Sequence, residues 1–491
     1  MKKNNKLNPH TPLNLNALEC KVRGGADPLV CGGPPGPTAE VPKTPRTSPL
    51  KPILTFALAF ALALSVAFGA AAASPAKTRK KPAAKRPAPR THAQTQAERT
   101  TASETVTNWL DAPLTLENPA ALVPFLERLY RAEKNPTAAA PIHVLHYGDS
   151  HTASDDWAAE LRSLFQSRFG NGGPGFSHAG RPYNGYRRYD VKSFGSLNWY
   201  THGLVGRDGD GMYGLAGIAM TASRPNQFVQ LYAQCQSAEL LYLQQPGGGP
   251  FELTVDGGDA QRIETDGPTI PGFIKIPAGP GEHRFEVRTL ESKPVRLFGW
   301  TTDNDHGITW ETLGINGAQA GMQLAWDADL LRAHITRRNP ALIVLAYGTN
   351  EAGNSDLTLE DYRATFTKVL ARMRQASPTA SLLVIGPPDR WVRTRAGWAP
   401  MNNIDIVTEA QRQASKSIGA AFFDLRARMG GKGSMRSWVQ AGLAQYDYVH
   451  LTSQGYKLFG AALYKEIAGQ FSAFQKVRDE VPGKTAIGRQ N

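Results

Sequence analysis

The chain has 491 residues, which is enough for two domains that each bury a hydrophobic core. Its formal net charge is +13, but residues 1–100 contribute 12 of these charges and the remaining residues carry only +1. This near-neutral remainder argues against a basic nucleic-acid-binding face.

The N-terminal region predicts export. We interpret residues 1–52, an unusually long lead, as unstructured or as the product of a misassigned start. Residues 53–74 follow as a signal peptide, because Ile53–Ala73 is almost entirely apolar and ends in small residues that suit signal peptidase. The apolar run is also long enough to span a bilayer, so an uncleaved anchor is the alternative. We therefore expect a periplasmic protein, either free or anchored in the inner membrane.

A basic linker, residues 75–100, is expected after this segment. Lys77–Arg90 is rich in Lys, Pro and Ala, and such a composition cannot bury a core. Cys20 and Cys31 precede the signal, so only Cys235 would survive cleavage. A lone cysteine in a β-rich stretch is expected to be a small core residue.

Residues 101–185 predict the first part of an α/β domain. The apolar strand Pro141–Tyr147 is preceded by a helical apolar stripe and followed by a helix from about Ser154. Gly148-Asp149-Ser150-His151 lies at the turn between strand and helix. A serine there projects beyond the sheet edge, and the N–H groups of the helix start face a developing oxyanion. Ser150 is the candidate nucleophile, and a buried turn serine is the alternative.

Residues 186–300 have a sequence pattern that predicts an antiparallel β-sandwich insertion. Short β-type runs alternate with Gly, Pro and Asp turns at a spacing typical of such folds. The predicted strands are Phe228–Ala233, Leu240–Leu243, Phe251–Val255, Phe273–Ile276, His283–Arg288 and Val295–Phe298.

Residues 301–475 return to alternating strands and helices, which indicates a parallel sheet covered by helices, and residues 476–491 are a tail. The predicted elements are Ala341–Tyr347, Leu359–Gln375, Ser381–Ile385, Asn402–Ser417, Ala420–Leu425 and Ser453–Phe471. The candidate serine precedes the β-rich segment and the remaining candidate residues follow it. The fold class is therefore α/β: one three-layer domain with a parallel sheet, interrupted by the insertion.

Two further motifs can join Ser150. Asn350 follows the strand Ala341–Tyr347, and ligands bind beyond the carboxyl ends of parallel strands. Its side-chain amide is a candidate oxyanion donor, with a turn cap as the alternative. Asp447 and His450 precede the last helix, so the carboxylate can hold one imidazole nitrogen while the other faces the serine. Taken alone, the Asp-x-x-His spacing is more often a surface pair.

A glycine motif supplies the third oxyanion donor. Gly314-Ile315-Asn316-Gly317-Ala318 stands where the chain re-enters the α/β domain, and a glycine lets the backbone approach a substrate closely. The candidate donors are the N–H groups of Ser150 and Gly317 and the amide of Asn350, with Gly314 competing with Gly317. Asp149 is expected to brace its turn, and His151 to pack or hydrogen-bond.

Other chemistries find less support in the sequence. Asp303-Asn304-Asp305-His306 offers oxygen ligands but lacks the spacing of a Ca²⁺ loop, so we expect a polar loop. Neither His-Glu-x-x-His nor Gly-x-Ser-x-Gly occurs, which removes the usual zinc-hydrolase and α/β-hydrolase signatures. No metal and no organic cofactor is implied.

With these motifs the chain resembles the SGNH/GDSL hydrolases. The matching blocks are Gly148-Asp149-Ser150, Asn316-Gly317, Gly348-Thr349-Asn350 and Asp447 to His450. Within that superfamily, the extended first two blocks look like those of periplasmic peptidoglycan O-acetylesterases. These carry a domain similar to carbohydrate-binding module family 35 between the serine and glycine blocks, where the β-rich segment falls here. One departure is Glu351, where many relatives have aspartate.

The resemblance implies a triad of Ser150, Asp447 and His450 that removes O-acetyl groups from peptidoglycan glycan strands, at the C6 hydroxyl of muramic acid. No nucleic-acid partner is expected. Contact with the membrane is expected only through the N-terminal segment, if that segment is not cleaved. The alternatives are an acetyltransferase that uses the same acetyl-serine, a general SGNH esterase or lipase, and a wall-binding protein without catalysis.

Overall fold

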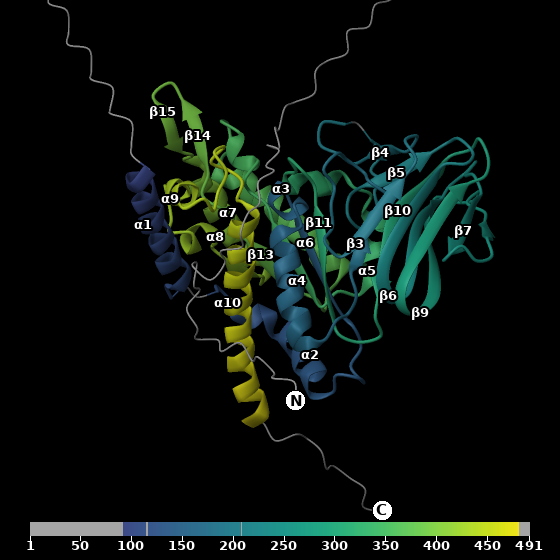
Figure 1. The fold of residues 1–491 in the computed structure, drawn as a ribbon, viewed down its shortest axis with the longest axis horizontal. Helices are drawn as coiled ribbons and strands as arrows, with labels where there is room; N and C mark the ends of the chain where they lie inside the picture. Colours follow the sequence, from purple (N-terminus) through teal and green to yellow (C-terminus); the bar gives the residue numbers. More distant parts are fainter. Residues whose placement is uncertain (1–91, 114–115, 208, 481–491) are drawn as a thin grey trace, which may run out of the picture. The chain divides into compact units, whose positions relative to one another are not determined.

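The computed structural model describes residues 92–113, 116–207 and 209–480 (Figure 1). The predicted lead, the predicted signal segment and most of the linker lie outside these residues. Helix α1 (His92–Asp111) begins inside the predicted linker, and helix α10 (Ser453–Glu480) continues into the predicted tail. No helix among the described residues has the length and apolarity needed to cross a membrane.

A five-stranded parallel sheet confirms the α/β fold class. Its strand order is β11-β1-β12-β13-β16, so the edge strand β11 pairs with β1 although the whole insertion separates them in the chain. The strands are β1 (Ile142–Gly148), β11 (Ile308–Gly314), β12 (Leu342–Ala346), β13 (Ser381–Ile385) and β16 (Ala421–Phe423). They are almost wholly buried, as expected for a parallel sheet covered on both faces.

Helices cover the two faces of this sheet. Val144 packs into one apolar cluster with helices α2, α4 and α10, whereas its neighbour Leu145 packs into a second cluster with α5, α6 and α7. The longer helices are α2 (Val123–Lys134), α4 (Asp156–Phe169), α5 (Ala328–Arg338), α6 (Leu359–Ala376) and α7 (Asn403–Ile418). The short ones are α3 (Ser150–Ala153), α8 (Leu425–Arg428), α9 (Met435–Gln440), η2 (Pro119–Leu122), η3 (Ala320–Ala325) and η4 (Glu351–Gly353).

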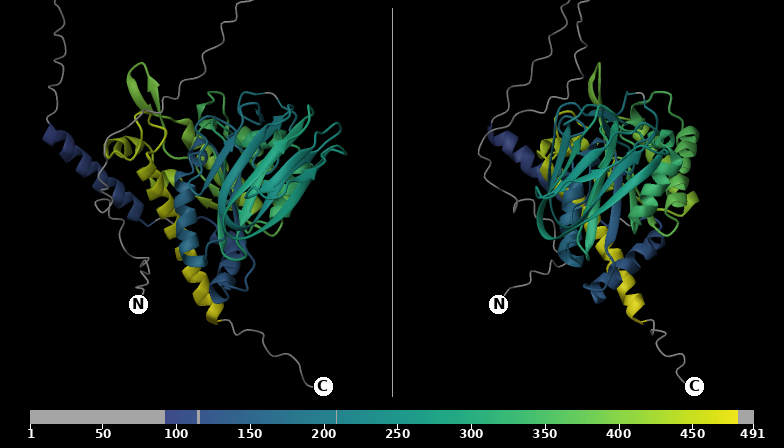
Figure 2. Two further views of the ribbon diagram at one scale, coloured as in Figure 1. Left: turned by 45° about the vertical axis from the view of Figure 1, so that its right-hand side comes forward. Right: turned by 90° about the vertical axis from the view of Figure 1, so that its right-hand side faces the viewer.

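The insertion is confirmed as β-rich and antiparallel, and the right-hand view of Figure 2 looks onto its long teal strands. Its nine strands form one hydrogen-bonded sheet in place of the two separate sheets of the predicted sandwich. They are β2 (Gly175–Ser177), β3 (Val191–Gly195), β4 (Tyr200–His202), β5 (Ala219–Ala222), β6 (Phe228–Gln244), β7 (Phe251–Val255), β8 (Gln261–Ile263), β9 (Ile270–Thr289) and β10 (Val295–Asp303).

Two predicted strand pairs are each one long strand. Phe228–Ala233 and Leu240–Leu243 belong to β6, whose register shifts between Cys235 and Ser237. A bulge at this point lets the strand bend without ending. Cys235 is buried in the core of the insertion, as predicted for a lone core cysteine.

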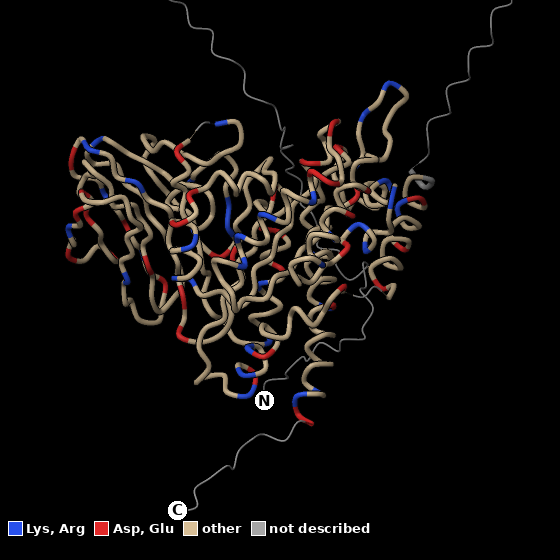
Figure 3. Tube along the Cα trace, turned by 180° about the vertical axis from the view of Figure 1, so that it is seen from behind, with Lys and Arg blue, Asp and Glu red and all other residues tan. Residues whose placement is uncertain are grey.

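A two-stranded hairpin, β14 (Trp391–Thr394) and β15 (Gly397–Pro400), belongs to neither large sheet and was not predicted. In Figure 3 it projects at the upper right and carries Lys or Arg positions without Asp or Glu. An isolated hairpin is only marginally stable in water, so contacts at its base have to hold it in place.

Candidate active site

Three loops leave the carboxyl edge of the parallel sheet at adjacent positions. Gly148, the last residue of β1, is in register with Gly314 of β11 on one side and Ala346 of β12 on the other. The N–H of Ile315 donates to the carbonyl oxygen of Gly148 at 3.0 Å, which joins two of these loops directly. The serine, glycine and asparagine blocks therefore converge at one edge, and the strand ends predicted this for Ser150 and Asn350.

Ser150 begins helix α3 directly after β1. Its N–H belongs to the first turn, where backbone donors have no intrahelical acceptor. Asp149 caps the helix, because its Oδ1 accepts a hydrogen bond from the N–H of His151 at 3.0 Å. A Cβ on Gly148 would lie 2.2 Å from Thr152 Oγ1, so only glycine permits this turn. The partly exposed Ser150 hydroxyl is thus held at the sheet edge.

The structure brings Ser150, His450 and Asp447 into one hydrogen-bonded chain. Ser150 Oγ lies 2.9 Å from His450 Nε2, and His450 Nδ1 lies 2.8 Å from Asp447 Oδ2. Asp447 Oδ1 also accepts from the N–H groups of Val449 and His450, at 2.9 and 3.0 Å. This geometry suits a nucleophile, a general base and the carboxylate that orients the base.

The Asp447 carboxylate stays ionised over the whole useful pH range. Burial would raise its pKa, but the hydrogen bonds from His450 and from the two backbone N–H groups outweigh burial and lower the pKa to about 2. An ionised carboxylate favours the His450 tautomer that has its proton on Nδ1. Nε2 is then free to accept the Ser150 proton.

Close packing of α10 on α4 places His450 over Ser150. The hydroxyl of Thr452, the residue just before α10, accepts from the N–H of Gly455 at 3.3 Å. Farther along, a Cβ on Gly460 would lie 2.9 Å from the carbonyl oxygen of Trp157 in α4, so a larger residue would push the helices apart. This close helix contact lies outside the four motifs.

The two candidate glycines have different environments. Gly317 is exposed and has a left-handed backbone with φ 76°, a conformation that favours glycine. Gly314 is buried, and a Cβ there would lie 2.2 Å from the backbone nitrogen of Ala153. Gly314 thus lets β11 approach α3, whereas the backbone of Gly317 is open to solvent. Asn350 reaches the same loop, since its Nδ2 donates to the carbonyl oxygen of Ala318 at 2.9 Å.

Comparison with known proteins agrees with this geometry. Residues 276–458 match the model of the GDSL-like lipase/acylhydrolase family, and Ser150 lies upstream of that range. The matched region and the hydrogen-bonded triad together show a serine ester hydrolase. A search of curated proteins found no match.

A solved structure of a peptidoglycan O-acetylesterase has the same fold as the hydrolase. The similarity covers 73% of this chain and 99% of that chain, with 24% sequence identity and a TM-score of 0.62. A family two carbohydrate esterase from Cellvibrio japonicus also matches, at 9% identity over 58% of this chain and 99% of that one. Its TM-score is 0.25, so no argument rests on it.

Sequence reasoning missed the structural role of Glu351 in the hydrolase. This buried side chain accepts hydrogen bonds at Oε1 from the N–H of Ala320, at 2.8 Å, and from the hydroxyl of Tyr362, at 3.1 Å. It therefore ties the segment after Asn350 to the segment after Gly317. The signal in the sequence was its position directly after the asparagine block, where many relatives have aspartate.

The buried position of Glu351 predicts that the stability of the folded hydrolase depends on pH. Burial raises its pKa to about 7, above the ordinary 4.5, so the folded state holds this proton more tightly than the unfolded chain. Stability is then lost as the pH rises from 4.5 through about 7. Asp149 acts in the same direction, because burial raises its pKa from 3.8 to about 6.

We expect Glu351→Gln to reduce the loss of unfolding free energy between about pH 5 and 8 by on the order of 1–3 kcal/mol. Urea unfolding at both pH values measures this loss. The exposed Glu360, changed to Gln, is the matched control and should leave the pH slope unchanged. A Glu351→Gln slope equal to that of the wild type would contradict the assignment.

His151 packs beneath the triad, as predicted. Its Nδ1 lies 2.8 Å from the hydroxyl of Tyr456, and its ring centroid is 5.3 Å from that of His450. Burial lowers the pKa of His151 well below its usual value, so the ring is neutral. A neutral ring adds no charge that would disfavour protonation of His450 during catalysis.

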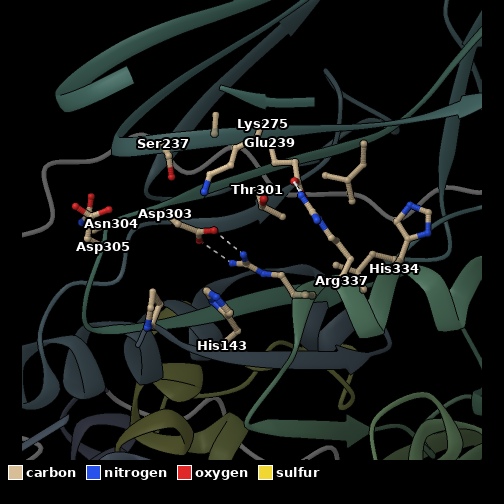
Figure 4. Close-up of a pocket in the computed structure, with 15 residues that line it drawn as sticks. His143, Ser237, Glu239, Lys275, Thr301, Asp303, Asn304, Asp305, His334 and Arg337 are labelled. Carbon is tan, nitrogen blue, oxygen red and sulfur yellow. Dashed lines mark hydrogen bonds and ion pairs between the residues drawn. The ribbon is translucent and has the colours of Figure 1, made fainter. Parts of the chain in front are cut away.

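A polar cavity lies elsewhere in the hydrolase. A cavity of about 470 Å³ opens between the insertion and α5, near the start of β1 and hence at the opposite end of that strand from Ser150 (Figure 4). Asp303, part of the predicted polar loop, ends strand β10 here and pairs with Arg338. Arg338 also pairs with Glu311 at 2.6 Å. These paired charges connect the insertion to the α/β domain.

Proposed function

We propose that the hydrolase is exported to the periplasm and removes O-acetyl groups from peptidoglycan glycan strands, at the C6 hydroxyl of muramic acid. The observation that carries the esterase chemistry is the chain from Ser150 through His450 to Asp447, with hydrogen bonds of 2.9 and 2.8 Å. The glycan substrate is supported by the shared fold with a peptidoglycan O-acetylesterase.

In the proposed first half-reaction, His450 Nε2 takes the proton of Ser150 as Oγ attacks the acetyl carbonyl carbon. The negative charge on the carbonyl oxygen is held by the N–H groups of Ser150 and Gly317 and by the amide of Asn350. The bond from the carbonyl carbon to the sugar oxygen then breaks, and that oxygen leaves with the proton from His450. An acetyl-serine remains.

In the second half-reaction, a water molecule replaces the sugar. His450 takes a proton from the water molecule as the water oxygen attacks the acetyl carbonyl carbon. The same oxyanion donors hold the negative charge on the carbonyl oxygen. The bond to Ser150 Oγ breaks, His450 returns the proton to Oγ, and acetate is released. No step uses a metal or an organic cofactor.

Acetate release from O-acetylated peptidoglycan by the full chain tests this proposal. Peptidoglycan from which the ester groups were removed by mild base is the control, and it should yield no acetate. Faster transfer than hydrolysis with an added acceptor glycan would instead support an acetyltransferase. Preference for long acyl esters would support a general esterase or lipase. Glycan binding without turnover of any acetate ester would support a wall-binding protein.

Asn350→Ala is expected to lower kcat on the order of 100-fold, because it removes one donor to the oxyanion. KM should change little, since the oxyanion forms only in the transition state. Steady-state kinetics with p-nitrophenyl acetate provides the measurement. Asn354→Ala, an exposed asparagine in the same loop, is the matched control. An equal effect of both substitutions would indicate that the loop, and not the amide, matters.

A further inference from the structure

The β14–β15 hairpin rests on the loop that carries two triad residues. The N–H of Trp391 donates to the carbonyl oxygen of Tyr448 at 3.0 Å, and the N–H of Met401 donates to the carbonyl oxygen of Arg390 at 2.8 Å. Tyr448 lies between Asp447 and His450 in the chain. The hairpin therefore starts beside the loop that carries Asp447 and His450. Strands β14 and β15 stand out at the upper left of the ribbon in Figure 1.

One face of the hairpin is aromatic. Arg393 pairs with Trp398 across the strands, and Trp391 lies two positions from Arg393, so these side chains share a face. The Tyr448 ring stacks on Trp398 with centroids 4.8 Å apart and planes inclined by 26°, and it also lies 5.5 Å from the Trp391 ring. Even so, Trp398 remains 40% exposed. The triad loop and the hairpin thus build one aromatic surface that is open to a ligand.

The same hairpin is positively charged. Arg393 and Arg395 are exposed near its tip, and residues 391–400 contain no Asp or Glu. Glycan strands that carry peptide stems present carboxylates, which Arg side chains bind well. Charge and aromatic surface therefore favour the same kind of ligand.

We propose that this hairpin is the glycan-binding arm of the active site, with Trp398 stacked on a sugar ring and Arg393 and Arg395 directed to stem carboxylates. This inference rests on the proposed function. A pyranose ring has a face of C–H groups with partial positive charge, which complements the negative face of an indole. An acetyl group alone offers little surface for recognition. Contacts to the rest of the substrate must therefore supply the specificity.

The test compares two substrates, p-nitrophenyl acetate and O-acetylated glycan fragments that retain their stems, with the full chain and its Trp398→Ala variant. The ratio of kcat/KM for the glycan to kcat/KM for the small ester should fall about tenfold, the loss expected for one aromatic stacking contact. Trp398→Phe should recover part of the ratio. Val392→Ala removes an exposed apolar side chain from the same hairpin and should leave the ratio unchanged. Arg393→Ala should lower the ratio for these stem-bearing fragments. It should not lower the ratio for fragments from which the stems have been removed.

An unchanged ratio in Trp398→Ala would overturn the inference. An equal loss on both substrates would also overturn it, because the hairpin would then only support the triad loop. Calorimetric binding of stem-bearing glycan to Ser150→Ala, with and without Trp398→Ala, separates the inference from the proposed function. If the wild type binds glycan through Trp398 but releases no acetate from it, the function fails and the binding arm stands. If acetate is released but Trp398→Ala does not weaken glycan binding, the proposed function stands and the binding arm fails.

Discussion

Replacing Ser150 with alanine is expected to lower kcat for an acetyl ester by a factor on the order of 10⁵ or more. The variant lacks the oxygen that forms the acyl intermediate, while His450, Asp447 and the oxyanion donors remain. The residual rate should therefore exceed that of the uncatalysed reaction in water. Steady-state rates with p-nitrophenyl acetate measure the loss. Any rapid first turnover that the wild type shows in a pre-steady-state measurement should be missing in the variant.

Ser154→Ala is the matched control for this substitution. Ser154 lies four positions after Ser150, and its hydroxyl donates to the carbonyl oxygen of His151 at 2.9 Å. It takes no part in the proposed reaction. We expect this variant to keep most of the wild-type rate. A Ser150→Ala enzyme with more than about a tenth of wild-type activity would show that another group attacks the ester.

Asp447→Asn is expected to lower kcat by about 10⁴-fold with little change in KM. An asparagine amide keeps the shape of the side chain, but it cannot stabilise the imidazolium that forms when His450 takes the serine proton. The wild-type carboxylate has a pKa of about 2 and stays ionised at every usable pH, so protonation of Asp447 should not limit its activity. Rates measured across the pH range should show the loss throughout.

Asp356→Asn changes an exposed carboxylate in the loop after Asn350 and serves as the comparison for this charge change. It should stay within about twofold of the wild type, as is usual for surface substitutions away from special features. If the two variants lost equal activity, the effect would come from net charge. If neither lost activity, Asp447 would have no role in orienting the base.

Convergence of the site could be predicted because it follows from strand ends. Ser150 and Asn350 each follow an apolar run, and carboxyl ends of parallel strands share one edge. Asp447 and His450 could be placed only by their spacing and by the resemblance. Their approach to Ser150 is a contact between residues 300 positions apart, which no local pattern reports.

Other features depend on contacts that local patterns do not encode. The polar residues near Cys235 resemble a turn, yet the partner strands carry β6 through a bulge. Strand β11 was not among the predicted strands, and its place beside β1 is set by tertiary pairing. The role of Glu351 needs the N–H of Ala320, which reaches it only in the folded chain.

The pairing of β1 with β11 has a consequence for how the enzyme matures. Paired residues such as His143 and Thr309 are 166 positions apart, and every residue of the insertion lies between them. Contacts this distant in sequence form slowly, because a long loop has to close before they contribute any stability. The newly made chain can pair β11 with β1 only after the intervening segment has left the ribosome. Activity should therefore appear late in biogenesis, after most of the chain has been synthesised.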